Sequence, residues 1–241
     1  MADITVSAKT PHPKFGASFM AYVATPPASS GQGGKGPGIL LIQEIFGVNK
    51  VMRDLADGFA RAGYVVACPD IFWRQQPGVQ ITDQTDAEWQ QAFGFFKGFD
   101  FALGIEDLTL TLEALRKHPA CSGKVGAVGY CLGGNLAYQM ACKSSSDGSV
   151  GYYGVGIENL LDQAKGIKKP LLLHIAEKDQ FCPPEAQAKI KDALAGNMLV
   201  TTHSYAGQDH AFARVGGKHY DAAAAALAND RTAAFFKSTL G

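Results

Sequence analysis

The sequence predicts an α/β fold with a mostly parallel central sheet and helices on both faces of that sheet. Segments of strand character alternate with segments of helical spacing along the 241 residues. Residues 38–42 and 64–68 are continuously apolar, as is typical of parallel strands covered on both sides. A Gly-rich turn at residues 129–134 joins an apolar run to a helical segment. No internal repeat is visible, so we expect one domain over residues 1–241.

The composition argues against several classes of partner. Lys plus Arg and Asp plus Glu both total 22, so no bulk charge attracts nucleic acid or an anionic membrane. No run approaches the ~18 apolar residues of a membrane span, and the first ten residues lack a signal-peptide pattern. The five cysteines are dispersed and free of C-x-x-C spacing, which fits reduced thiols. We expect a cytoplasmic protein, a monomer or weak homodimer, that acts on a small molecule.

In the first half of the chain, residues 4–7 and 19–23 alternate between apolar and polar side chains, which predicts antiparallel edge strands. Residues 26–37 are rich in Gly, Ser and Pro and predict a turn. The two apolar strands follow, together with a long polar loop over 71–85 and helices over 51–62, 86–97 and 100–117. Of the aromatic residues Phe93, Phe96 and Phe99, at least two are expected to pack inward.

In the second half, residues 124–128 predict the strand before the Gly-rich turn, and 135–142 predict the helix after it. The other expected strands cover residues 150–153, 170–175 and 198–205, and the other helices cover 185–194 and 221–240. Because active sites of such sheets form at the carboxyl ends of the strands, we expect the catalytic groups in the loops there.

The turn Gly129-Tyr130-Cys131-Leu132-Gly133-Gly134 has the pattern of a nucleophile elbow, with Cys in place of the usual Ser. Gly129 and Gly133 let strand and helix approach closely, because neither has a Cβ. The amide of Leu132 then lies at a helix N-terminus, where it can donate a hydrogen bond to a developing oxyanion. The alternative is a buried structural cysteine in a tight turn.

Cys131, Asp179 and His210 follow predicted strands in the order nucleophile, acid, base, which is that of an α/β-hydrolase. A thiol is mostly protonated near pH 7, so His210 would make the thiolate and Asp179 would fix the tautomer and orientation of the imidazole. Two other acids compete with Asp179. Asp70 follows too early a strand, and the side chain of Asp209 should diverge from that of its neighbour His210.

The other histidines are weaker candidates for the base. His174 lies within a strand pattern, which predicts a core residue, while His12 and His118 occupy turn or helix-end positions. His203 and His219 stay open by position, although neither lies in a Gly-bounded loop after a strand. The sequence has no H-E-x-x-H and no tight Cys/His cluster, so it does not predict a metal site.

Glu44 is an acid that directly follows a predicted buried strand. At the carboxyl end of that strand it would face the same crevice as Cys131, where it could hold the thiol proton or perturb His210. The amide of Ile45 would then form the oxyanion hole together with that of Leu132. An acid beside a strand end is otherwise a helix cap or an ion-pair partner, and this alternative stays open.

Five motifs form a set: Gln43-Glu44-Ile45-Phe46-Gly47, Cys68-Pro69-Asp70, Gly126-x-x-Gly129-Tyr130-Cys131-Leu132-Gly133-Gly134, Glu177-Lys178-Asp179 and His210-Ala211-Phe212-Ala213-Arg214. The set resembles the dienelactone hydrolase family over about residues 15–236, and the elbow with Cys is its most specific part. The resemblance implies an α/β-hydrolase fold without cofactor or metal. It also implies hydrolysis of an enol-lactone to an open-chain dienoic acid, as in chlorocatechol degradation.

The same resemblance implies roles for individual residues. Cys131 corresponds to the nucleophile of the triad, Glu44 to the acid that takes the thiol proton when substrate binds, and Arg214 to the arginine that holds the substrate's carboxylate. Three positions depart from the family's best-known members. Trp89 and Phe93 stand where an ungapped alignment places a second arginine and a tyrosine, and Ala211 stands where those members have Ser. A surface ion pair is the alternative for Arg214.

Three functional hypotheses follow. The first is a lactone or carboxylic-ester hydrolase of the dienelactone type, which acts through an acyl-thioester on Cys131. The second is a general carboxylesterase with a more apolar pocket, lined by Trp89 and Phe93. The third is a catalytically silent binding protein of hydrolase fold. The complete set of Cys131, Asp179 and His210 argues against silence, because a binding protein needs none of the three.

Overall fold

The computed structural model describes residues 3–28 and 33–241. The chain forms two compact units, Met1–Gly126 and Ala127–Gly241, and each is described by itself. Residues 29–32 of the turn expected over 26–37 lie outside the described residues, as do the first two residues of the N-terminal segment.

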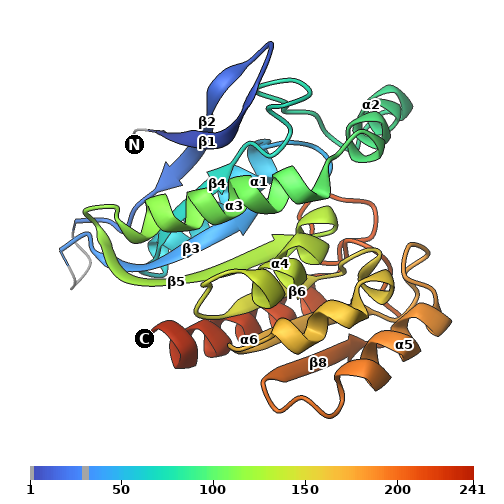
Figure 1. The fold of residues 1–241 in the computed structure, drawn as a ribbon. Helices are drawn as coiled ribbons and strands as arrows, with labels where there is room; N and C mark the ends of the chain where they lie inside the picture. Colours follow the sequence, from blue (N-terminus) through green and yellow to red (C-terminus); the bar gives the residue numbers. More distant parts are fainter. Residues whose placement is uncertain (1–2, 29–32) are drawn as a thin grey trace. The chain divides into compact units, whose positions relative to one another are not determined.

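The first unit contains an antiparallel hairpin followed by parallel strands (Figure 1). Its strands are β1 (Ile4–His12), β2 (Gly16–Ala24), β3 (Gly36–Ile42), β4 (Val65–Pro69) and the beginning of β5 (Cys121–Tyr130). They are hydrogen-bonded in the order β1-β2-β4-β3-β5. The two edge strands and the two apolar strands predicted from the sequence are confirmed, and the hairpin strands extend further toward their turn than the alternation indicated.

The helices of the first unit are α1 (Lys50–Arg61), α2 (Asp86–Lys97) and α3 (Phe101–Arg116). Each begins where the sequence places a capping side chain. Asn49, Thr85 and Asp100 each accept a hydrogen bond from the backbone amide three residues later. Figure 1 shows α3 in front of the strands of this unit and α1 behind them. All three predicted helices are confirmed to within one residue at each end.

The expectation that at least two of Phe93, Phe96 and Phe99 pack inward agrees with Phe96 and Phe99, and Phe93 is the exception. Phe93 is 39% exposed, whereas Phe96 and Phe99 are half-buried. The ring that α2 buries most deeply is Phe95, which stacks on Phe72 with ring centroids 5.2 Å apart. The buried positions of α2 are Ala92 and Phe95, each one residue before Phe93 and Phe96. One residue turns a helix by about 100°, so Phe93 and Phe96 lie off the centre of the buried face.

The second unit contains four parallel strands in the order β5-β6-β7-β8. The three strands after β5 are β6 (Ser149–Tyr152), β7 (Leu171–Ala176) and β8 (Val200–Tyr205). The strand expected at 198–205 begins two residues later than predicted, because residues 197–200 form a turn in which the amide of Val200 donates to the carbonyl of Asn197 at 2.9 Å. Predicted and observed bounds of the other strands agree within three residues.

The helices of the second unit are α4 (Leu132–Lys143), α5 (Pro184–Leu194) and α6 (Ala222–Leu240), with two short 3₁₀ turns, η1 (Ile157–Asn159) and η2 (Leu161–Gly166). Side chains of β7 alternate between two packed faces. Leu173 and its neighbours on the same face pack against residues of α4 and α5. The opposite face presents His174, which contacts Thr232 of α6. The α4 and α6 helices therefore cover opposite faces of these strands.

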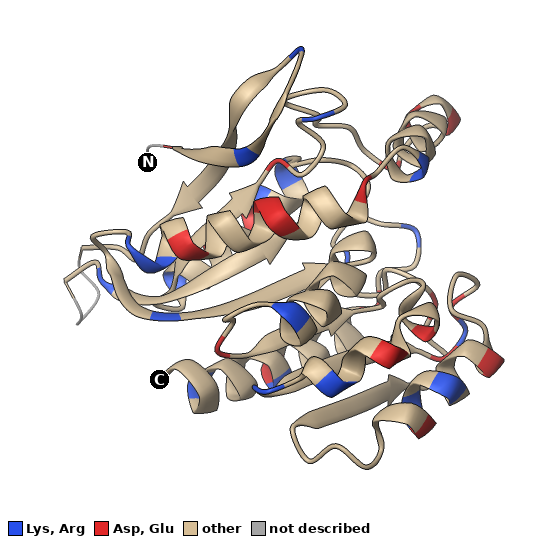
Figure 2. Ribbon diagram, in the orientation of Figure 1, with Lys and Arg blue, Asp and Glu red and all other residues tan. Residues whose placement is uncertain are grey.

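Charged side chains of both signs share the same surfaces. Figure 2 shows Lys and Arg interspersed with Asp and Glu along α5. This pattern agrees with the equal totals of basic and acidic residues in the sequence. None of the helices in the described part of the chain is both long and apolar enough to cross a membrane.

Candidate active site

Cys131 is the residue between the last residue of β5 and the first residue of α4. Its backbone has φ +56° and ψ −115°, a conformation that L-residues other than Gly rarely adopt. The Cys131 amide donates to the carbonyl of Tyr152 at 3.1 Å, which attaches the turn to the end of β6. The side chain is buried, at 6% exposure. The sulfur is therefore held on strained backbone at a helix N-terminus, as an elbow requires.

The glycines of the turn are required by close backbone contacts. A Cβ added to Gly129 would lie 1.9 Å from the carbonyl oxygen of Gly133. A Cβ on Gly134 would lie 2.5 Å from the carbonyl oxygen of Tyr152. These positions tolerate no larger residue, because backbone atoms rather than flexible side chains occupy the space. The amide of Leu132 is among the first of α4, where the helix leaves N–H groups available to an anion.

His210 and Asp179 form a buried pair next to this turn. Asp179 lies in the loop after β7 and His210 in the loop after β8. The distance from His210 Nδ1 to Asp179 Oδ2 is 2.7 Å, and the two side chains are only 5% and 1% exposed. The other oxygen, Asp179 Oδ1, accepts a hydrogen bond of 2.8 Å from the amide of Phe181. The carboxylate is thus fixed on both sides and orients the imidazole.

The charge state of His210 follows from three opposing effects. Burial by itself lowers the pKa of His210, but the charge on Cys131 and the hydrogen bond with Asp179 outweigh it and raise the pKa to about 10. The remaining ring nitrogen, Nε2, is buried and makes no hydrogen bond within the described residues. Nε2 is therefore the nitrogen left to exchange a proton with the thiol.

Two aromatic rings flank the imidazole of His210. The ring centroids of Tyr153 and Phe181 lie 5.2 Å and 4.9 Å from that of His210, each at a steep interplanar angle. Tyr153 and Ala211 also have positive φ values, 37° and 64°. Among the described residues, Cys131, Tyr153 and Ala211 are the residues other than Gly that have a positive φ. Backbone strain thus concentrates around the imidazole, as is typical of functional sites.

The sequence argument did not identify Tyr153 or Phe181. Tyr153 directly follows β6, and Phe181 lies two residues after Asp179. The signal that could have found both is their position at the carboxyl ends of strands, where the triad residues were also sought.

The competing residues have structural partners elsewhere. Asp70 accepts hydrogen bonds from the amides of Phe72 and Gly78 in the first unit, where burial raises its pKa to about 6. Asp209 Oδ1 accepts from the backbone amide of His210, not from the ring. His174 is a core residue as predicted: burial lowers its pKa to about 3, and it bonds to Tyr205 and Thr232. In the described chain, none of these groups competes with the Asp179–His210 pair.

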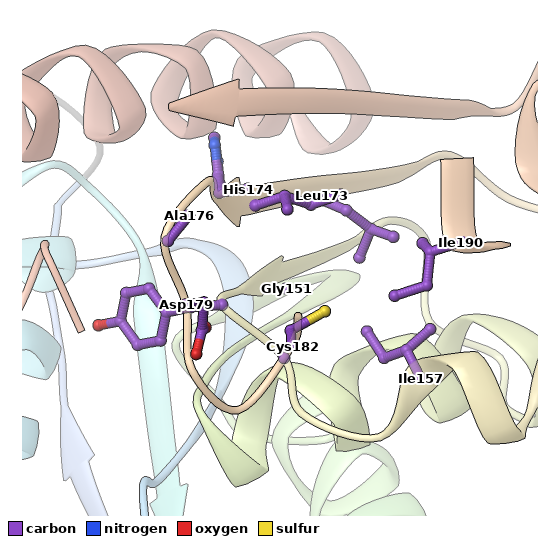
Figure 3. A pocket seen from close by; sticks show the side chains of 11 residues that line it. Gly151, Ile157, Leu173, His174, Ala176, Asp179, Cys182 and Ile190 are labelled. Carbon is purple, nitrogen blue, oxygen red and sulfur yellow. The ribbon is translucent and has the colours of Figure 1, made fainter. Parts of the chain in front are cut away.

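A cavity of about 10 Å³ adjoins Asp179 within the second unit (Figure 3). Its lining is mostly apolar and includes Ile157, Leu173, Cys182 and Ile190. Figure 3 shows the Cys182 sulfur directed toward Ile157 and Ile190. A volume of this size holds about one water molecule, so a lactone cannot bind there. The cavity lies beside Asp179 and is too small to serve as a substrate pocket.

The remaining predicted site residues of the first unit lie at the end of β3 and on α2. Glu44 and Ile45 directly follow β3, and both side chains are buried, at 4% and 5% exposure. Trp89 is half-buried and packs edge-to-face on Phe46, with ring centroids 5.1 Å apart. Phe93 packs on Trp89 at 5.5 Å. Trp89 and Phe93 therefore form one aromatic cluster with Phe46, the residue that follows Ile45.

Arg214 lies four residues after His210 and is buried, at 7% exposure. Its amide donates to the carbonyl of Ala211 at 2.9 Å, so a tight turn links the two positions. Arg214 is therefore not a surface residue, while the alternative of an ion-paired arginine stays open. The role of Arg214 toward a substrate stays a prediction, as do the roles of Glu44, Ile45, Trp89 and Phe93.

The comparisons with known proteins agree on one family. The model of the dienelactone hydrolase family matches residues 19–240. A protein of Azospirillum brasilense is 52% identical over 234 residues, which cover 93% of this chain and 95% of that protein. The carboxymethylenebutenolidase of Pseudomonas putida is 39% identical over 216 residues, covering 90% and 89%. A crystal structure of a Klebsiella pneumoniae protein assigned as a dienelactone hydrolase gives a TM-score of 0.80 at 25% identity, covering 98% and 99%.

Proposed function

The chain belongs to the dienelactone hydrolase family, whose members are lactone and ester hydrolases of α/β-hydrolase fold, and we propose that it hydrolyses a small enol-lactone through Cys131, His210 and Asp179. The observation that supports this mechanism best is the buried Asp179–His210 pair. The Nε2 atom of His210 makes no hydrogen bond in the described chain, and the charge on Cys131 raises the pKa of the His210 imidazole. Such a pair has the parts needed to form and protect a thiolate nucleophile.

In the first half of the reaction, the Cys131 sulfur attacks the lactone carbonyl carbon. The carbonyl oxygen becomes an oxyanion, and the amide of Leu132 donates to it. As the tetrahedral intermediate collapses, the ring C–O bond breaks and an acyl-thioester remains on Cys131. The imidazolium of His210 gives its Nε2 proton to the departing enol oxygen.

In the second half, the now neutral His210 takes a proton from water, and the resulting hydroxide attacks the thioester carbonyl. The C–S bond breaks, the free carboxylic acid forms, and the sulfur leaves as the thiolate beside the reprotonated imidazole. One water is consumed per lactone, so the cycle balances without a cofactor. Asp179 holds the imidazole in the same tautomer and orientation throughout.

A comparison of substrates tests the proposal. The purified protein is assayed on enol-lactones, simple lactones and aryl esters, with the spontaneous rate subtracted for each. We expect the highest kcat/KM for an enol-lactone. Iodoacetamide kinetics provide a second measurement: a catalytically silent protein would show no cysteine that reacts faster than a free thiol. Absence of both turnover and a fast-reacting cysteine would overturn the enzymatic assignment.

A general carboxylesterase is the second candidate, and the aromatic cluster on Phe46 favours it. Trp89 and the 39% exposed Phe93 offer apolar surface where a cation and a phenol stand in the family's best-known members. A higher kcat/KM for aryl esters than for every lactone would make this the better assignment.

We expect Glu44→Gln to fold normally and lose activity. The substitution keeps the shape of the buried side chain but removes a carboxylate whose charge is proposed to act on the Cys131–His210 pair, so the pH dependence of thiol reactivity should shift. The measurement is the pH dependence of iodoacetamide reactivity together with kcat. Asp70→Asn is the matched control, because Asp70 is a buried carboxyl of the same unit that anchors a loop. If Glu44→Gln instead retains full kcat and only melts at a lower temperature, Glu44 is a structural residue.

For Arg214→Ala we expect loss of the preference for anionic substrates. A guanidinium can hold a substrate carboxylate bidentately, and losing one charge-assisted contact should reduce the discrimination by about 1.5–3 kcal/mol. The assay compares kcat/KM for a lactone carrying a free carboxylate with kcat/KM for its methyl ester. Arg231→Ala serves as control, because the guanidinium of Arg231, on α6, lies over the ring of Tyr205 at the end of β8. A wild type without any preference for the acid would show that Arg214 does not bind substrate.

A further inference from the structure

The acid of the triad is carried by a short turn that buries several carbonyl groups. Within this turn, the amide of Asp179 donates to the carbonyl of Ala176 at 3.3 Å, and the amide of Cys182 donates to that of Asp179 at 3.2 Å. On one side, the turn is attached to the loop of the base. The Lys178 amide donates to Gln208 at 2.8 Å, and Glu177 Oε2 accepts from the amide of Gly207 at 2.7 Å. Both of these attachments hold the turn from the direction of His210.

A single side chain holds the turn from its other side. Gln187 Nε2 lies 2.7 Å from the carbonyl oxygen of Cys182, 3.0 Å from that of Ala176 and 3.1 Å from that of Glu177. The Gln187 side chain is buried, at 4% exposure. Its amide has two hydrogens, so three acceptors share them. One amide therefore ties together the residues on both sides of Asp179.

The start of α5 explains why Gln187 can reach the turn. Pro183 caps the helix and Pro184 is its first residue, which suits a position that needs no amide donor. The amide of Gln187 donates to the carbonyl of Pro183 at 3.0 Å, so this residue lies one turn into the helix. Helical side chains tilt toward the N-terminus of their helix. That tilt directs the Gln187 side chain back onto the turn that precedes α5.

We propose that Gln187 is a positioning residue of the hydrolase, which keeps Asp179 at hydrogen-bond distance from His210 by clamping the carbonyls of the acid turn. The proposal rests on the proposed function, because it assigns Gln187 a part in that reaction. Without the amide, two buried carbonyls and a partly buried one lose their shared donor. The turn can then relax, and Asp179 moves with it. A displacement of about 1 Å in a catalytic group costs on the order of 10²-fold in rate.

The test compares Gln187→Met with Gln139→Met. Gln139 is the matched control, because it is a buried glutamine of the same unit, on α4, whose Nε2 donates to Asn135 Oδ1 at 2.8 Å. We expect Gln187→Met to lower kcat roughly 10- to 100-fold with little change in KM. The pKa of His210, measured by NMR titration of its ring, should fall because its hydrogen bond with Asp179 weakens. Gln139→Met should lose stability but keep the wild-type kcat and His210 titration.

Gln187→Glu covers the case in which Gln187→Met does not fold. The Glu side chain has nearly the shape of Gln, but its carboxylate only accepts hydrogen bonds and so cannot bond to the three carbonyls. Its protonated acid form can donate one hydrogen bond. Its kcat, relative to wild type at the same pH, should therefore recover as the pH falls. A wild-type His210 titration in either folded variant would overturn the proposal and leave Gln187 a structural residue. The NMR measurement needs no substrate, so it separates this failure from a wild type that hydrolyses no lactone.

Discussion

Replacing Cys131 by Ala is expected to reduce turnover by roughly 10³-fold or more, because the covalent route disappears with the sulfur. The fold should tolerate the change, since Ala is smaller than Cys and the turn depends on its neighbouring glycines. The pKa of His210 should also fall, because the charge on Cys131 is one of the causes that raise it. Steady-state kinetics and NMR titration of the imidazole measure the two effects on the same sample.

The covalent intermediate can be located directly. Incubation with a slowly hydrolysed lactone, followed by peptide mass analysis, should place the acyl group on Cys131. Burial raises the pKa of the Cys142 thiol to about 11 and that of Cys182 to about 12, so both are protonated and unreactive near neutral pH. Cys142→Ala is the control and should keep wild-type turnover. A reproducible adduct on Cys68 or Cys182 would contradict the assignment of the nucleophile.

The strands and helices were predictable because local chemistry determines them. Residues 38–42 and 64–68 are apolar throughout, and the structure buries both runs in parallel strands. The three helices of the first unit begin at Asn49, Thr85 and Asp100, residue types that are strongly preferred at the N-cap of a helix. The sequence did not indicate that Phe93 is the exposed ring, because the register of one helix decides which ring is buried. A sequence pattern of adjacent phenylalanines does not determine that register.

The placement of the three candidate catalytic residues was also predictable, whereas that of their surroundings was not. Cys131, Asp179 and His210 follow β5, β7 and β8, which belong to one parallel set of strands, so the topology brings them to one edge of the sheet. Gln187 carries no such signal, because a glutamine on an amphipathic helix is normally a surface residue. Its importance becomes visible only when its three carbonyl partners are located in space.

Asp179→Asn is the second change for which we expect a large effect, a loss of roughly 10³- to 10⁴-fold in kcat. Asn keeps the shape of Asp but can donate as well as accept. An amide that donates to Nδ1 would fix the wrong tautomer, and Nε2 would then carry a proton when it must accept one from water. Because the carboxylate no longer stabilises the imidazolium, the pKa of His210 should also fall from about 10.

The direction of the pH effect follows from that shift. The first half of the reaction needs the imidazolium form of His210, so the wild-type rate should decline as the pH rises through about 10. In Asp179→Asn this alkaline limb should move to lower pH, because a lower pKa deprotonates the imidazole sooner. An aryl ester is the suitable substrate, with spontaneous hydrolysis subtracted at each pH. Asp209→Asn is the control: its carboxylate contacts the backbone amide of His210 rather than the ring, so the limb should stay in place. If Asp179→Asn and wild type share the same alkaline limb, Asp179 does not govern the imidazole, and the acid of the triad must be sought elsewhere.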